Sequence, residues 1–118
     1  PKFINIVAVI ETSLSPENLA SILILIEHSL ERKRSKKNEP RTCDIDIIDY
    51  DNKILNFKYK DLDFVVPHKD LKNRNFVLFP LKEILPEWIH PQTKESVNLL
   101  IEKLSMNDKN SILKVMKP

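Results

Sequence analysis

The sequence predicts an α+β fold, because strand-type and helix-type patterns are mixed along the chain instead of alternating strictly. Three segments support this prediction. Residues 3–10 form a continuous apolar run rich in β-branched side chains, residues 16–30 place apolar side chains at helical spacing, and residues 42–50 alternate apolar with polar side chains. The 118 residues amount to one domain or less.

The run FINIVAVI at residues 3–10 is typical of a strand in the middle of a sheet, covered on both faces. Asn5 interrupts it, and a buried amide without hydrogen-bond partners costs about 1–3 kcal/mol. We therefore expect either the fold or a ligand to supply partners for Asn5. Such a strand also needs neighbours on both of its edges, and residues 111–116 are the remaining candidate for the second edge.

A helix is predicted to begin at Pro16, because Ser15 can act as the N-cap and Glu17 places an acid at the positive end of the helix dipole. The apolar positions at helical spacing form its expected buried stripe: Leu19, Ile22, Leu23, Ile26 and Leu30. Residues 31–41 contain no apolar side chain and predict a polar connector.

The alternating segment TCDIDIIDY at residues 42–50 predicts a second strand. Asp51-Asn52 follows as a tight turn, since Asn tolerates the left-handed conformation, and residues 53–59 would return as a short hairpin arm. Further along, we expect a helical turn over residues 80–85 and a helix over residues 93–104.

Composition excludes several classes of site. A chain without glycine cannot form a Walker-type phosphate loop or a G-x-G-x-x-G turn, and a single cysteine, Cys43, excludes a disulfide framework or a Cys-rich zinc site. Nineteen basic and seventeen acidic residues give a charge of +2, which is too balanced to indicate a nucleic-acid partner. No apolar run reaches membrane-spanning length. We expect a cytoplasmic protein that binds neither nucleic acid nor membrane.

Two acidic residues of the predicted second strand are candidate metal ligands. Asp44 and Asp46 would leave the same face about 6.6 Å apart at the backbone, and such a pair suits Mg²⁺, which takes one or two protein carboxylates and fills its shell with water and phosphate oxygens. The alternative is an ordinary strand whose exposed face is acidic, and the pattern alone favours that alternative.

Cations stand on both sides of this pair in the sequence. The connector from Arg32 to Arg41 is a solvated charge run when taken alone, but its position next to the acidic pair also suits neutralisation of a polyphosphate. His68, Arg74 and Phe76 follow a second polar stretch. A turn histidine and a core phenylalanine are the alternatives for two of them.

Three stretches together resemble the 6-hydroxymethyl-7,8-dihydropterin pyrophosphokinase family of the folate pathway. They are FINIVAVIETSLSPENLASILILIE, PRTCDIDIIDYDN and VVPHKDLKNRNFVLFPLKEILPEW, which cover the chain from Phe3 to about His90. The resemblance implies a ferredoxin-like sheet with helices on both faces in three layers. It also implies that residues 1–118 form the C-terminal two-thirds of the pyrophosphokinase domain, without the family's N-terminal strand-helix-strand.

The resemblance implies an enzyme that transfers pyrophosphate from ATP to the hydroxymethyl group of the dihydropterin, with two Mg²⁺ ions, giving AMP and the pterin diphosphate. The residues that match the family's motifs would then have these roles: Asp44 and Asp46 as metal ligands, Arg32 and Arg41 in catalysis, His68 and Arg74 in ATP binding, and Asn5 and Phe76 in pterin binding. The chain would be fused to, or act beside, another enzyme of the pathway.

Two other functions remain open from the sequence. A degenerate, non-catalytic relative could keep the fold as an interaction or regulatory domain, although such a domain would have no need of the whole polar set. A small basic RNA-binding module would explain the connector's cations but not the acidic pair beside them.

Overall fold

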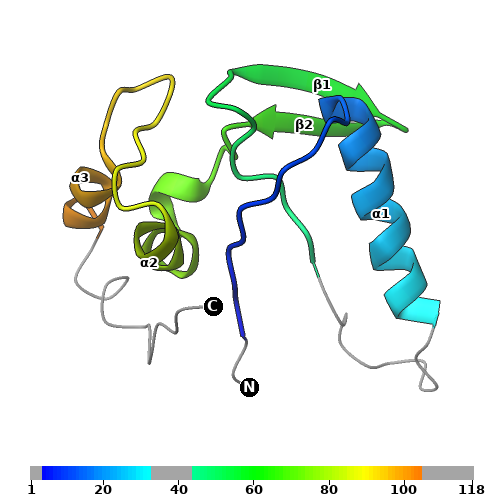
Figure 1. Cartoon of the computed structure of the whole chain (residues 1–118), viewed down its shortest axis with the longest axis horizontal. Helices are drawn as coiled ribbons and strands as arrows, with labels where there is room; N and C mark the ends of the chain where they lie inside the picture. Colours follow the sequence, from blue (N-terminus) through cyan, green and yellow to red (C-terminus); the bar gives the residue numbers. More distant parts are fainter. Residues whose placement is uncertain (1–3, 33–43, 105–118) are drawn as a thin grey trace.

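The computed structural model describes residues 4–32 and 44–104, and it confirms the α+β class. The elements follow in the order α1 (Pro16–Arg32), β1 (Leu55–Tyr59), β2 (Leu62–Val66), a short 3₁₀ helix η1 (Leu71–Asn73), α2 (Asn75–Ile84) and α3 (Val97–Glu102). Helix α1 lies on one side of the molecule and α2 with α3 on the other (Figure 1). Within the described ranges no helix is both long and apolar enough to cross a membrane.

Helix α1 begins where the local signals predict. The Oγ atom of Ser15 accepts a hydrogen bond from the Asn18 amide at 3.2 Å, and its carbonyl accepts one from the Leu19 amide at 2.8 Å. The expected buried stripe is only partly correct, because Leu19 is buried while Ile22 and Ile26 are 41% and 42% exposed. The helix packs against β1 near its start, and the rest of its apolar face lacks a covering layer in the described part of the chain.

Strands β1 and β2 form an antiparallel hairpin with Leu55 opposite Val66 and Phe57 opposite Phe64. The two phenylalanine rings stack at 5.1 Å between centroids. Lys60 and Asp61 join the strands with φ angles of 48° and 65°, the left-handed pair that a two-residue hairpin turn requires. The strand predicted over residues 53–59 therefore exists but pairs with the segment that follows it, not with residues 42–50.

The prediction of two further strands, at residues 3–10 and 42–50, is wrong for the part of these segments that the structure describes. Residues 4–10 and 44–49 carry no strand assignment, and the sheet of the described residues has two strands only. Ile4 and Ile6 are 87% and 81% exposed, whereas a central strand would bury them. The physical reason is that a strand needs a hydrogen-bonding neighbour, and no described segment pairs with either one. The tight turn predicted at Asp51-Asn52 is confirmed, with φ angles of 53° at Asp51 and 55° at Asn52.

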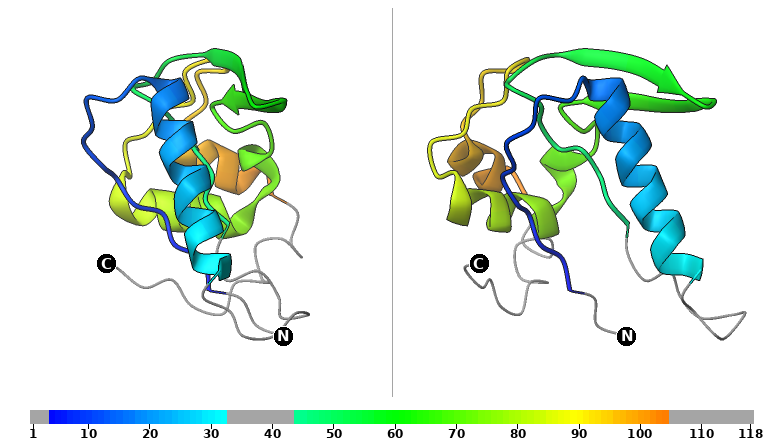
Figure 2. Two further views of the ribbon diagram at one scale, coloured as in Figure 1. Left: turned by 90° about the vertical axis from the view of Figure 1, so that its right-hand side faces the viewer. Right: turned by 45° about the vertical axis from the view of Figure 1, so that its right-hand side comes forward.

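The hydrophobic core lies in the last third of the described chain. Its buried members come from η1, α2, α3 and the residues between and after them: Leu71, Val77, Leu78, Leu81, Trp88, Val97, Leu100 and Leu104. Helix α2 starts five residues before the predicted turn and contains Pro80, while α3 is shorter than predicted and is capped by Ser96, whose Oγ accepts from the Leu99 amide. The segment 44–49 runs between this helical unit and α1 (Figure 2). This position brings Asp46 close to the start of α2.

Candidate functional site

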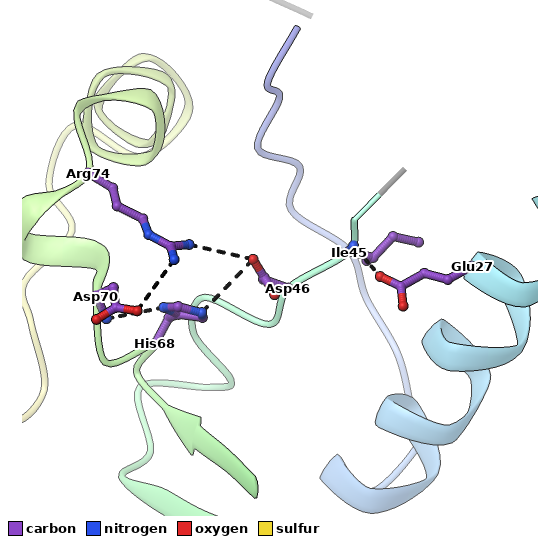
Figure 3. A network of polar contacts seen from close by, with 6 residues as sticks. All are labelled: Glu27, Ile45, Asp46, His68, Asp70 and Arg74. Carbon is purple, nitrogen blue, oxygen red and sulfur yellow. Dashed lines mark hydrogen bonds and ion pairs between the residues drawn. The ribbon is translucent and has the colours of Figure 1, made fainter. Parts of the chain in front are cut away.

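Four polar residues from two parts of the chain meet where segment 44–49 faces the start of α2. They are Asp46, His68, Asp70 and Arg74, and we call them the polar cluster (Figure 3). His68 follows β2 directly after Pro67, while Asp70 and Arg74 flank η1. The amide of His68 donates to the carbonyl of Ile48 at 2.9 Å, so a backbone hydrogen bond joins the two parts beside the cluster.

Arg74 and His68 both point at one carboxylate oxygen. Oδ2 of Asp46 lies 3.7 Å from Nη1 of Arg74 and 3.9 Å from Nε2 of His68. Nη2 of Arg74 also donates to Oδ2 of Asp70 at 3.3 Å. The guanidinium group is therefore held between two carboxylates, with its planar fork directed at the segment that carries Asp46.

Asp70 orients the imidazole through its backbone. Its amide donates to Nδ1 of His68 at 3.2 Å, which makes Nδ1 an acceptor and leaves the proton of the neutral ring on Nε2. Nε2 is the nitrogen that faces Asp46. The ring thus presents a hydrogen-bond donor toward the space beside the carboxylate.

Phe76 extends the cluster with an aromatic face. It lies in the first turn of α2, its ring centroid is 5.4 Å from the guanidinium carbon of Arg74, and it is 38% exposed while its neighbours Val77 and Leu78 are buried. Phe76 is therefore not a core residue, and its ring is accessible beside a cation.

The ion pairs of the cluster are weak enough to exchange partners. The side chains of Asp46, Asp70 and Arg74 are 50%, 47% and 30% exposed, and solvent-accessible pairs of this kind are worth about 0.2–1 kcal/mol each. A phosphate group could therefore accept hydrogen bonds from Arg74 and His68 in place of Asp46 at a small cost in free energy. The carboxylate of Asp46 would then be available to a divalent cation.

The other predicted site residues are placed as follows. Asp44 is exposed two residues before Asp46, and Asn5 is exposed as well, so the expectation of a buried amide is wrong: water can solvate it, because no layer of the described chain covers residues 4–6. Arg32 is the last residue of α1. Arg41 and the connector from residue 33 onward lie outside the described residues.

The acidic pair has the ligand count of a magnesium site. The described ranges contain no group of three or more His, Cys, Asp or Glu side chains arranged to hold a metal ion. Mg²⁺ is commonly held by one or two carboxylates, with water and substrate phosphates completing its shell. Asp46, which lies beside the donors of Arg74 and His68, and the exposed Asp44 two residues before it fit that description, whereas a zinc or calcium site would need more protein ligands.

Two residues of this region were missed by the sequence interpretation. Asp70 had a detectable signal, because it stands four residues before Arg74 in a polar stretch. Glu27 had none: it lies on α1, eighteen residues from its partner, and its Oε2 accepts a hydrogen bond from the Ile45 amide at 2.6 Å (Figure 3).

A second network of ion pairs is centred on Glu95 and holds the 3₁₀ helix η1 in place. Glu95 pairs with Lys72 of η1 at 3.2 Å and with Lys103 after α3. Hydrogen bonds from Lys103, Thr93 and Lys72 lower the pKa of Glu95 to about 2. Burial, followed by the positive charge of Lys72, lowers the pKa of nearby His90 below its ordinary value. This network ties η1, between His68 and Arg74, to the helical core.

A separate groove of about 450 Å³ lies away from the polar cluster, between the turn at residues 51–52 and the end of α2. Asp49, Glu87 and Trp88 are among its lining residues. None of the four cluster residues lines it, so the groove adds nothing to the chemistry of the cluster.

Comparison with known proteins gives a consistent result. Residues 1–86 match the model of the 7,8-dihydro-6-hydroxymethylpterin-pyrophosphokinase family. The chain is 36% identical over 104 residues to the 2-amino-4-hydroxy-6-hydroxymethyldihydropteridine pyrophosphokinase of Synechocystis sp., covering 88% of this chain and 51% of the relative. It is 38% identical over 94 residues to the protein of the same name from Haemophilus influenzae, covering 80% of this chain and 56% of the relative.

A longer relative is also similar. The chain is 37% identical over 113 residues to the folic acid synthesis protein fol1 of Pneumocystis carinii, which covers 96% of this chain and 15% of that protein. The chain thus spans about half the length of the two bacterial relatives and a small part of the fungal one.

Proposed function

Because the chain belongs to the 7,8-dihydro-6-hydroxymethylpterin-pyrophosphokinase family, we propose that it serves the transfer of pyrophosphate from ATP to the hydroxymethyl group of 6-hydroxymethyl-7,8-dihydropterin. The products are AMP and the pterin diphosphate of folate biosynthesis. The observation that supports this proposal most is the convergence of Asp46, His68 and Arg74 from segments far apart in the sequence.

The polar cluster has the parts that a triphosphate requires. Arg74 supplies a planar fork of donors and His68 a single donor at Nε2, both aimed at the space beside Asp46. Asp44 and Asp46 would hold Mg²⁺, which when bound offsets the charge of the phosphate oxygens. The chain's own contribution is to place the donors and carboxylates beforehand, since phosphoryl-type transfer is catalysed mainly by positioning and charge neutralisation.

The remaining roles follow from position. Arg32 stands at the end of α1, where the basic connector begins, and we assign it with Arg41 to neutralising the transferred group. Phe76 would stack on the pterin with its accessible face, and Asn5 would hydrogen-bond the pterin ring. An exposed Asn5 has free capacity for a ligand, and that capacity is consistent with this role.

We also propose that residues 1–118 form the C-terminal portion of the pyrophosphokinase domain and work beside other parts of the folate pathway. The apolar side chains of residues 4–10 are largely exposed, Val9 and Ile10 by 60% and 61%, and strands on either edge of this segment would cover them. Such strands would come from the portion of the family's domain that this chain does not match. The proposed location is the cytoplasm.

The test measures AMP formation from Mg-ATP and the dihydropterin by the full chain, together with binding of a non-hydrolysable ATP analogue. Asp44→Asn and Asp46→Asn should each remove most turnover with little loss of stability, because exposed positions tolerate isosteric changes. Asp63→Asn is the matched control, since Asp63 is an exposed aspartate on the hairpin, 66% accessible. A double variant of Asp44 and Asp46 that retained full magnesium-dependent turnover would refute the proposal, and so would a wild-type chain that bound no nucleotide.

A further inference from the structure

Segment 44–49 carries the acidic pair but has no strand partner among the described residues. Its position is held instead by individual hydrogen bonds and by Ile48, which packs against the hydrophobic core. The His68 amide donates to the carbonyl of Ile48, the Tyr50 hydroxyl donates to the carbonyl of Leu14 at 2.6 Å, and the Ile45 amide donates to Oε2 of Glu27 at 2.6 Å. The contact with Glu27 is the one that lies within the acidic pair itself.

Ile45 stands between Asp44 and Asp46, so a hydrogen bond that holds its backbone amide also restrains the backbone from which both neighbouring side chains extend. A carboxylate that accepts from a backbone amide forms a charge-assisted hydrogen bond, which is stronger than one between neutral groups. This bond is also partly shielded from water, since both Glu27 and Ile45 are half-buried. The geometry points to Glu27 as a positioning residue that sets the two carboxylates for a divalent cation.

Glu27 does not itself complete a metal site. Within the described part of the chain no three acidic, histidine or cysteine side chains are arranged as a ligand group, although Glu27 contacts the backbone between Asp44 and Asp46. Its carboxylate is directed at the Ile45 amide (Figure 3). Outer groups that orient metal ligands in this way typically change metal affinity by about 10–100-fold when they are removed.

This inference rests on the proposed metal role of Asp44 and Asp46, and two readouts keep the two ideas distinguishable. The first is the hydrogen-exchange rate of the Ile45 amide, measured by NMR on the full chain without metal or nucleotide. The second is binding of Mn²⁺ in the presence of a non-hydrolysable ATP analogue, measured by electron paramagnetic resonance. Neither readout requires turnover.

Three variants are compared with wild type. Glu27→Ala should accelerate exchange of the Ile45 amide and weaken Mn²⁺ binding by about 10–100-fold. Glu27→Gln should restore both properties nearly to wild type, because its amide oxygen still accepts the hydrogen bond. Glu17→Ala is the matched control, since it removes a carboxylate from the first turn of the same helix, far from Ile45 along the chain.

Unchanged Mn²⁺ binding in Glu27→Ala, with the Ile45 amide now exchanging faster, would overturn the positioning role while leaving the proposed function intact. Equal losses in the Gln and Ala variants would overturn it too, because the carboxylate's charge and not its hydrogen bond would then matter. If Mn²⁺ binding survived the loss of both Asp44 and Asp46, the metal assignment and this inference would fall together.

Discussion

Replacing Arg74 with alanine should separate the stability of the protein from its affinity for nucleotide. In the structure the guanidinium group pairs with Asp46 at 3.7 Å and with Asp70 at 3.3 Å, and it stands 5.4 Å from the ring of Phe76. Exposed ion pairs contribute about 0.2–1 kcal/mol, and a solvent-accessible cation–π contact contributes a similar amount. If the three contacts add, the free energy of unfolding should fall by about 1–3 kcal/mol.

The effect on nucleotide binding is a separate quantity. A hydrogen bond to an ionised group is worth about 1.5–3 kcal/mol, which corresponds to a loss of about 10–150-fold in affinity when Arg74 is removed. Arg74→Lys should recover only part of that loss, because an ammonium group keeps the charge but not the planar fork. Urea denaturation measures the stability, and titration with a fluorescent ATP analogue in the presence of Mg²⁺ measures the affinity.

Lys58→Ala provides the control, since Lys58 forms a comparable but more exposed pair with Asp63 at 3.8 Å on the hairpin. It should change neither measurement appreciably. The reasoning would be refuted if Arg74→Ala bound the analogue as tightly as wild type. A loss of stability well above about 3 kcal/mol would contradict it equally, because it would exceed the sum of the three exposed contacts and make the cluster a structural element.

Three further predictions concern stability. Leu78→Ala should lower the free energy of unfolding by about 2–5 kcal/mol, since Leu78 is fully buried in the helical core, and urea denaturation would show a small change if that core were loosely packed. Lys60→Gly should raise it by about 0.5–1 kcal/mol, because Lys60 has a φ angle of 48°; thermal denaturation with no gain would contradict the left-handed turn. Glu95 has its pKa lowered from 4.5 to about 2, so its contribution is complete above pH 4.5 and is lost as the pH falls toward 2. Glu95→Gln should therefore make the free energy of unfolding depend less on pH in that window. An unchanged pH dependence, measured by acid denaturation, would show that Glu95 and its lysine partners do not cause the loss of stability.

The sequence predicted those features whose signals are local. The start of α1 followed from Ser15, Pro16 and Glu17, which act within one turn of the helix. The turn at residues 51–52 followed from the tolerance of Asn for the left-handed conformation. Burial of Val77 and Leu78 in the core gives a physical reason why α2 extends through Pro80, whose own preference would have ended the helix.

Features that depend on distant partners were not predictable in the same way. The run at residues 3–10 has every local property of a strand, yet strand formation requires a neighbour, and the described residues supply none. The motifs identified Asp46, His68 and Arg74 as candidates, but only the fold shows that they meet. The role of Glu27 could not be predicted, because a contact between a helix side chain and a backbone amide eighteen residues away follows no fixed spacing in the sequence.

The position of the core has a consequence for the order of folding. All eight of its buried members lie between Leu71 and Leu104, so their contacts close short loops. Chains form such local contacts faster than distant ones, and we expect the helical unit to be an early folding nucleus that also resists proteolysis longest. Asp46 lies outside this nucleus, whereas His68 directly precedes it and Arg74 lies within it. The cluster would then be completed only when segment 44–49 docks, which makes the last step of folding also the step that assembles the site.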